Sequence, residues 1–166
     1  IMFVIAFALL ANLAVVTSFS FHGATAPLGV FDPLQFQSKN SPEQLARFRE
    51  AELKHARWGM ISAVSIPLIE SKTHLPAIHE FDHLSDNTQI IVVALILMGE
   101  FGTMLKGWKD PFKNGTDNYF KLKPEYQPGD LGFETSNPDD VDMANKELNN
   151  GRLAMIASLG MIAQEL

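Results

Sequence analysis

The chain has 166 residues with 13 Lys and Arg against 19 Asp and Glu, so its formal net charge is −6, and it contains no Cys. An acidic chain without a basic block does not suit nucleic-acid binding, and the lack of Cys excludes disulfide scaffolds, thiolate zinc sites and cysteine nucleophiles. Apolar residues make up 46% and charged residues 19%, below the roughly 25% charged residues of soluble domains. The length fits one domain, either soluble or embedded in a membrane.

The first apolar block covers residues 1–16 and is interrupted only by Asn12. A helix of this length reaches about 24 Å, which is short of a bilayer core of about 30 Å. We therefore expect residues 1–18 to be a targeting (signal) segment that is cleaved near residues 17–20, with a true membrane anchor as the alternative. Residues 19–166 then form the domain.

An arm and a long helix follow the leader. Residues 19–40 contain several Gly and Pro without a helical period, which predicts an extended arm. The run Ser41-Pro42-Glu43-Gln44 has the pattern of a capping box with Pro at the first helical position. It predicts a helix over residues 42–69 that is charged in its first half, apolar in its second, and bent or ended by Pro67.

Two more helices are expected. Residues 71–87 are predicted to be a polar connection. Residues 88–105 are wholly apolar over 90–98, have Glu100 as their only charge and reach about 27 Å, which is enough to cross a bilayer. Residues 106–142 are predicted to be a long loop. A third helix is expected from Val141 or Asp142 to Leu166, where the chain is expected to be truncated.

The most informative feature is an internal repeat. The ten residues Glu52–Ile61 align with Glu147–Ile156, and five positions are identical: Glu, Leu, Arg, Met and Ile. Related entries precede the two helices, at residues 27–32 and 128–134. A repeat that includes its flanks indicates that the first and third helices share one architecture.

Both repeats place an acid and an Arg where the helix becomes apolar. An isolated charge in a bilayer costs about 2.5–3.5 kcal/mol on insertion scales, so these charges should be paired. A two-fold arrangement predicts reciprocal ion pairs, Glu52 with Arg152 and Glu147 with Arg57. Small residues at the same level would let the two backbones approach closely: Ala56, Gly59, Gly151 and Ala154.

These motifs resemble those of the light-harvesting chlorophyll-binding proteins. The resemblance rests on Glu-x-x-His-x-Arg at 52–57 and Glu-x-x-Asn-Gly-Arg-Leu-Ala-Met at 147–155, each after a Phe-acid turn, and it covers about residues 26–166. The arm motif Ala-Pro-Leu-Gly-Val-Phe-Asp-Pro-Leu at 26–34 is most similar to the algal fucoxanthin chlorophyll a/c-binding antennae. The resemblance implies an all-α membrane protein with three transmembrane helices, the first and third crossed and related by a pseudo-two-fold repeat.

The resemblance also implies a set of chlorophyll ligands. Glu52 and Glu147 would coordinate magnesium while remaining paired to Arg, and His55 and Asn150 would each ligate another chlorophyll. Magnesium is a hard cation that prefers oxygen ligands and accepts imidazole when the macrocycle supplies the other donors. Further candidates come from the third and middle helices: Gln164, Glu100 and, more weakly, Gln89.

Other readings of these residues stay open. The Glu–Arg pairs would also serve a purely structural role, and a lone His is most often a packed side chain. Trp58 and the Met residues of the helices are expected to be packing residues: Met60, Met155 and Met161. His79 and His83 are four residues apart, but with only Asp82 nearby we interpret them as loop residues rather than a metal site.

Lys and Arg are distributed unevenly over the connections. Three lie in the arm and helix entry, one lies in the first connection at residues 71–87, and six lie between residues 106 and 146, in the second connection and the start of the third helix. The positive-inside rule therefore places the arm and second connection on one side of the membrane and the first connection on the other. In the resembling family these sides are stroma and lumen, and the leader, with Phe19 or Phe21 near its end, would be part of a two-part plastid address.

The expected function is that of a light-harvesting antenna without catalytic chemistry, because no nucleophile–base pair or metal cluster stands out. The resemblance implies chlorophyll a, chlorophyll c and a carotenoid such as fucoxanthin as cofactors, and multi-pass insertion in the plastid thylakoid membrane. The expected partners are a photosystem core, other antenna subunits, thylakoid lipids and further copies in a homo- or hetero-oligomer. Two alternatives are a photoprotective relative that dissipates energy and a pigment-free membrane scaffold.

Overall fold

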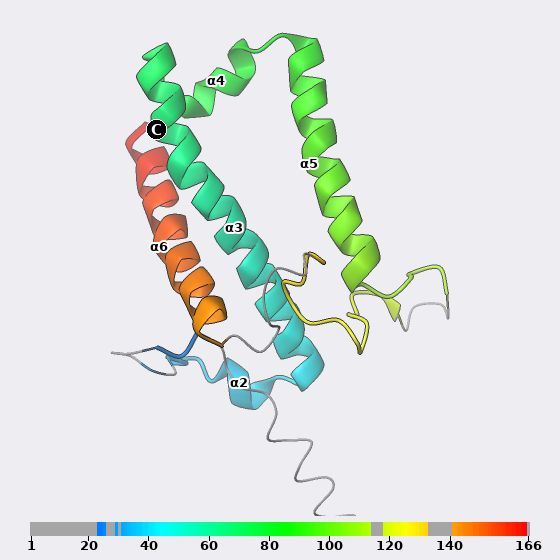
Figure 1. The fold of residues 1–166 in the computed structure, drawn as a ribbon. Coiled ribbons are helices and arrows are strands. Elements are labelled where there is room, and N and C mark those ends of the chain that lie inside the picture. The colour runs from blue at the N-terminus through cyan, green and yellow to red at the C-terminus, as the bar shows by residue number, and fades with distance from the viewer. Residues whose placement is uncertain (1–22, 26–28, 30, 114–117, 133–140, 166) are drawn as a thin grey trace, which may run out of the picture.

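The computed structural model describes residues 23–25, 29, 31–113, 118–132 and 141–165, and the expected targeting segment at residues 1–18 lies outside them. The described helices are α2 (Phe36–Lys39), α3 (Pro42–Thr73), α4 (Ala77–His83), α5 (Asp86–Gly107) and α6 (Val141–Glu165). In Figure 1, α3 and α6 lie side by side and run in the same direction, while α5 runs in the opposite direction on the other side of α3. The three long helices are therefore those that the sequence predicts.

Helix α3 begins as predicted and ends later. The Ser41 backbone N–H donates to Gln44 Oε1 at 2.8 Å, which completes the capping box, and Pro42 is the first helical residue. The expected end at residue 69 is wrong, because the helix passes through Pro67 and ends at Thr73. An interior proline costs about 3 kcal/mol. The buried Ile66 and the packing of α3 on α6 and α4 outweigh that cost.

Two short helices lie in segments where the sequence predicts none. Helix α4 occupies part of the connection at 71–87, so His79 and His83 are helical rather than loop residues. Helix α2 interrupts the arm, where the two carboxylate oxygens of Asp32 accept from the backbone N–H groups of Phe36 and Gln37 at 2.8 and 2.9 Å. Helices of seven and four residues are too short to show a period in the sequence.

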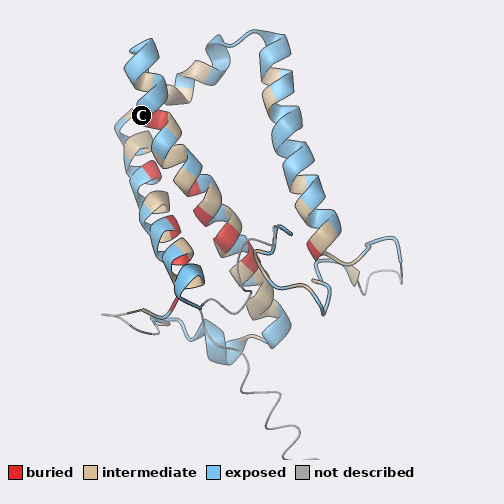
Figure 2. Ribbon diagram, in the orientation of Figure 1, coloured by how far each residue is buried: buried red, intermediate tan, exposed pale blue. Residues whose placement is uncertain are grey.

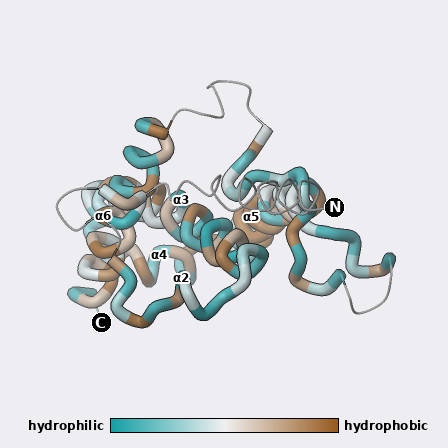
Figure 3. Tube along the Cα trace, turned by 90° about the horizontal axis from the view of Figure 1, so that it is seen from below, coloured by the Kyte–Doolittle hydropathy of each residue, from teal (hydrophilic) through white to brown (hydrophobic). Residues whose placement is uncertain are grey.

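Helix α5 starts two residues before its predicted start. Ser85 is the N-cap and its hydroxyl accepts from the Thr88 backbone N–H, so the helix begins at Asp86. Among the described helices, α5 alone is long and apolar enough to cross a membrane by length and composition. Figure 3, which views the chain from below, shows hydrophobic segments at α5. Helix α6 begins at Val141 as expected, and its last expected residue, Leu166, lies outside the described part.

The described residues form a very small core. The buried apolar side chains are Leu53, Ala56 and Ile66 of α3 and Leu148 of α6. Figure 2 shows these buried positions gathered between α3 and α6. In α5 only Gly107 is buried. The fold therefore holds together at one helix pair and exposes most of its apolar side chains, among them Ile61, Val64, Leu97, Met98, Ile156 and Leu159.

Candidate functional site

The two predicted ion pairs are present between α3 and α6. Arg57 Nε lies 2.7 Å from Glu147 Oε1, and Arg152 Nη2 lies 2.7 Å from Glu52 Oε1. Glu52 also accepts from Arg49 at 2.9 Å. The side chains of both glutamates are about one-third exposed, at 29% and 33%. Each carboxylate is thus neutralised by its neighbour while one part of it faces outward.

Each paired arginine also donates a hydrogen bond to the loop that precedes the helix of the other repeat. Arg57 Nη2 donates to the Gly129 carbonyl at 2.7 Å, and Arg152 Nη1 donates to the Gly23 carbonyl at 2.8 Å. Both glycines have positive φ angles, 87° and 98°, a region that residues with a Cβ rarely adopt. The loop that precedes one helix is therefore fastened to the other helix.

The same two glycines donate their backbone N–H groups to equivalent positions of the two repeats. Gly129 donates to Glu50 Oε2 at 2.7 Å, and Gly23 donates to Asn145 Oδ1. Glu50 and Asn145 each lie two residues before the paired glutamate of their helix. The sequence repeat did not reveal these contacts, because an acid and an amide occupy the equivalent positions.

Small residues allow the helices to touch at the level of the ion pairs. A Cβ added to Gly151 would collide with the Cβ of Ala56, and one added to Gly59 would meet Met155. The Ser158 hydroxyl donates to the Gly59 carbonyl at 3.0 Å. The close approach expected from the sequence is therefore present, and backbone contacts reinforce it.

His55 and Asn150 lie on the outer faces of α3 and α6. The His55 Nδ1 atom lies 2.7 Å from the Ala51 carbonyl oxygen. A carbonyl only accepts, so Nδ1 carries the proton and the lone pair of Nε2 stays available. The Asn150 and Gln164 side chains are exposed and have no hydrogen-bond partner within the described part of the chain. His55, Asn150 and Gln164 therefore each keep an atom with a free lone pair that can bind a ligand outside the protein.

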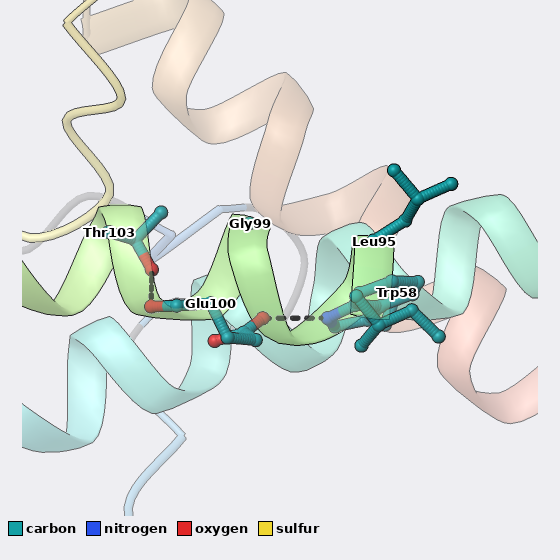
Figure 4. A pocket seen from close by; sticks show the side chains of 6 residues that line it. Trp58, Leu95, Gly99, Glu100 and Thr103 are labelled. Carbon is teal, nitrogen blue, oxygen red and sulfur yellow. Dashed lines mark hydrogen bonds between the residues drawn. The ribbon is translucent and has the colours of Figure 1, made fainter. Parts of the chain in front are cut away.

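Glu100 lies between α5 and α3 and has partners that the sequence did not indicate. Its carboxylate accepts from Lys54 Nζ at 2.6 Å and from the Trp58 indole N–H at 3.0 Å. Glu100 and Trp58 line a hollow of about 340 Å³ together with Leu95 and Ile96. Figure 4 shows the Glu100 carboxylate beside the Trp58 ring. A third neutralised carboxylate thus borders an apolar space.

Gln89 has a structural partner. Its side-chain amide donates to the carbonyls of Phe81 and Leu84 at 2.9 and 3.1 Å, at the end of α4. Last carbonyls of a helix need such donors. The contact gives Gln89 a role in joining α4 to α5.

Tyr126 joins the second connection to α3 and α5. Its hydroxyl donates to the buried Glu50 at 3.1 Å, and its ring covers Gly107 at the end of α5. Burial, followed by the negative charge of Glu50, raises the pKa of Tyr126 above its ordinary value of 10.0. The neutral phenol is therefore the form that the fold requires.

This pKa predicts an alkaline loss of stability. A phenol with a raised folded-state pKa contributes its full stability below pH about 10 and loses it as the pH rises further. In a Tyr119→Phe variant, Tyr126 is the single tyrosine, so its phenolate absorbance should appear only together with unfolding. The additional change Tyr126→Phe should remove this part of the pH dependence. A reversible phenolate signal in the folded protein would contradict the contact with Glu50.

The comparisons with known proteins agree with this geometry. Residues 20–166 match the family described as Chlorophyll A-B binding protein. Light-harvesting complex stress-related protein 3.2 of Chlamydomonas reinhardtii is 36% identical over 163 residues, an alignment that covers 87% of this chain and 62% of that protein. The chain thus spans less than two thirds of the length of this relative.

This chain aligns with a larger share of two algal relatives. The fucoxanthin-chlorophyll a-c binding protein of Isochrysis galbana is 35% identical, with 86% of this chain and 74% of that protein aligned. The protein of the same name from Chattonella marina var. antiqua is 34% identical, with 86% and 67% aligned. The chain belongs to the chlorophyll a/b-binding family, the light-harvesting chlorophyll-binding proteins whose repeated motif it carries.

Proposed function

We propose that this chain is a light-harvesting antenna that binds chlorophylls and carotenoids and passes excitation energy to a photosystem, with no catalytic step of its own. The observation that carries the proposal is the combination of neutralised carboxylates with the very small core that the described residues form. Most apolar side chains of α3, α5 and α6 are exposed. Such surfaces need a non-protein cover, and lipid together with flat apolar pigments supplies it.

The donor atoms at the site fit chlorophyll magnesium. Bound chlorophyll would supply light absorption and a magnesium ion for these residues to hold. Glu52 and Glu147 offer carboxylate oxygens whose negative charge Arg152 and Arg57 neutralise, and Arg49 adds a second cation at Glu52. His55 offers Nε2, while Asn150 offers its amide oxygen.

Further ligands are proposed at the ends of the site. Gln164 is exposed near the end of α6, and Glu100 borders the hollow beside Trp58. Lys54 gives Glu100 the same neutralisation that the arginines give the other two glutamates. Gln89 is the weakest candidate because its amide already serves α4.

The proposal includes three membrane spans with α3 and α6 as a crossed, pseudo-two-fold pair. The reciprocal ion pairs and the two glycine loops support this symmetry. The Glu and Arg residues of the repeat are paired at one level, which lowers the cost of these charges in a bilayer. The plastid thylakoid membrane is the proposed location, with residues 1–18 as a targeting segment and with photosystem and antenna subunits as partners, because the relatives are chloroplastic proteins.

The relatives support two variants of this function. The fucoxanthin-chlorophyll a-c binding proteins favour harvesting with chlorophyll a, chlorophyll c and fucoxanthin. The stress-related relative, at a similar identity, favours photoprotective dissipation by the same pigments. The fluorescence lifetime of the pigment-loaded chain separates the two, since dissipation shortens it.

The ligand assignments predict separate pigment losses. His55→Leu and Asn150→Leu should each remove about one chlorophyll per protein without unfolding it, because each residue ligates one magnesium. Pigment extraction after reconstitution measures this stoichiometry. His83→Leu and Asn87→Leu are matched controls at exposed positions of α4 and α5 and should lose none. An unchanged pigment count in both ligand variants would refute these assignments.

A further inference from the structure

Three aromatic side chains stand out of the connection that follows α5. Phe112 is 95% exposed, Phe120 is 75% exposed and Tyr119 is 52% exposed. Phe112 and Phe120 are the two most exposed large hydrophobic side chains in the described part of the chain. Large rings in water carry a free-energy cost, so such a group marks an interaction surface.

The connection is held in place rather than left loose at its base. The Lys109 N–H donates to the Lys121 carbonyl, and the Lys123 N–H donates to the Gly107 carbonyl, both at 2.9 Å. Lys123 Nζ also donates to the Leu105 carbonyl at 2.8 Å, which caps the end of α5. The residues that flank the aromatic side chains are therefore bonded to each other and to the end of α5.

Phe120 adopts an unfavourable backbone conformation. Its φ angle is 56°, in the left-handed region that a bulky residue rarely enters. Arg47 of α3 donates to the Phe120 carbonyl at 3.1 Å and helps to hold this conformation. Strain of this kind persists where the surroundings enforce it, and it is typical of functional segments. Here its result is an exposed ring.

Lysines accompany the rings. Residues 106–123 contain five Lys and two Asp, a local net charge of +3 in a chain whose net charge is −6. Lys106 is paired with Asp130 and Lys123 serves the helix end. The ammonium groups of Lys109, Lys113 and Lys121 have no such partner among the described residues. Three cations are thus available beside the exposed rings.

The position of this connection at the end of α5 indicates what kind of partner it binds. The connection leaves the end of α5, the helix that qualifies as a membrane span, so it lies at the level of the lipid headgroups. Rings prefer that interfacial level, and clustered lysines there attract anionic headgroups. An acidic protein would suit the lysines as well, but it gives no reason for rings at the end of a span.

We propose that Lys109, Phe112, Lys113, Tyr119, Phe120 and Lys121 form a lipid-binding surface that seats on anionic headgroups of the adjacent leaflet. The rings enter the interfacial layer and the lysines bind the headgroup charges. The inference rests on the membrane insertion of α5 in the proposed function. The surface would fix the height and tilt of the pigment-bearing helices relative to the membrane.

The pigment-loaded full chain in nanodiscs tests this proposal with spin-labelled lipids. Motionally restricted phosphatidylglycerol and phosphatidylcholine are measured separately, and the chain should prefer phosphatidylglycerol. Lys109→Gln/Lys113→Gln/Lys121→Gln should bring this preference several-fold closer to parity. Lys72→Gln removes an exposed lysine from α3, on the far side of the proposed bilayer, and should leave the preference unchanged.

A second measurement tests the rings. The chain has no Cys, so Phe112→Cys gives a single site for a nitroxide. Its relaxation should respond more to oxygen than to an aqueous nickel complex, whereas a label at Gln127→Cys should respond to the nickel complex.

The outcomes separate the two proposals. No restricted lipid of either kind would contradict membrane insertion itself. Restricted lipid without a phosphatidylglycerol preference, or a preference that survives the triple Lys change, would overturn the lipid-binding surface alone. A water-exposed label at position 112 would overturn it as well and leave an acidic protein as the partner.

Discussion

Replacing Arg57 by Leu is expected to destabilise the pigment-loaded protein by about 3–5 kcal/mol, because lipid and pigment exclude water from the proposed site and the loss of one partner there leaves an unpaired charge. Glu147 would lose its contact at 2.7 Å, and the Gly129 carbonyl would lose its donor. Assembly with pigment should therefore fail, or the product should lose chlorophyll. Pigment stoichiometry and the thermal loss of pigment circular dichroism measure the effect.

Two further variants test whether the loss of stability in Arg57→Leu comes from the broken ion pair. Arg47→Leu removes an arginine from the first turns of the same helix, where its side chain donates to the Phe120 carbonyl, and this variant should keep the pigments. The double variant Arg57→Leu/Glu147→Gln should recover part of the lost stability, since no unpaired charge remains. Normal pigment content and thermal stability in Arg57→Leu would count against the ion pair as the lock between the helices.

Gly151→Ala is expected to have the second largest effect. The added Cβ would collide with the Cβ of Ala56, and the nearby Ala56 backbone leaves no room for it to shift. Overpacking of this kind costs about 1–3 kcal/mol. It would also separate the helices and stretch both ion pairs. The expected readout is a lower pigment yield and a lower midpoint of thermal pigment loss.

The same helix provides the control. Gly160 has open space where a Cβ would lie, so Gly160→Ala should leave pigment yield unchanged or raise stability by up to about 1 kcal/mol through helix propensity. Equal behaviour of the Gly151 and Gly160 variants would mean that the close approach of α3 and α6 does not limit assembly.

The long helices and their ion pairs were predictable because their signals are local or repeated. The capping box at Ser41 marks the start of α3, and the apolar run marks α5. The duplicated Glu and Arg positions predicted both pairs, since charges in an apolar phase need partners. Pro67 misled the prediction of the end of α3, because tertiary packing outweighed a local helix-breaking preference.

Other parts of the site depend on contacts that no local pattern encodes. The Lys54 contact with Glu100 joins residues 46 positions apart. The Gly129 N–H donates to Glu50 of one repeat, and the Gly23 N–H donates to Asn145 of the other. The two contacts are equivalent although the two acceptor residues differ, so the structure is more symmetric than the sequence. Gly129 has a positive φ and lies against Leu53 and Arg57 of α3. The sequence around Gly129 does not predict this contact.

Reconstitution of the chain with chlorophyll a, chlorophyll c and carotenoid tests the central claim most directly. The measurement is the excitation spectrum of chlorophyll a fluorescence. The account predicts chlorophyll c and carotenoid bands in that spectrum, because the helices hold the pigments close enough for energy transfer. Bound but strongly quenched pigment would favour the dissipative variant of the function. A folded helical protein that retains no pigment would contradict the ligand assignments and leave a membrane scaffold as the function.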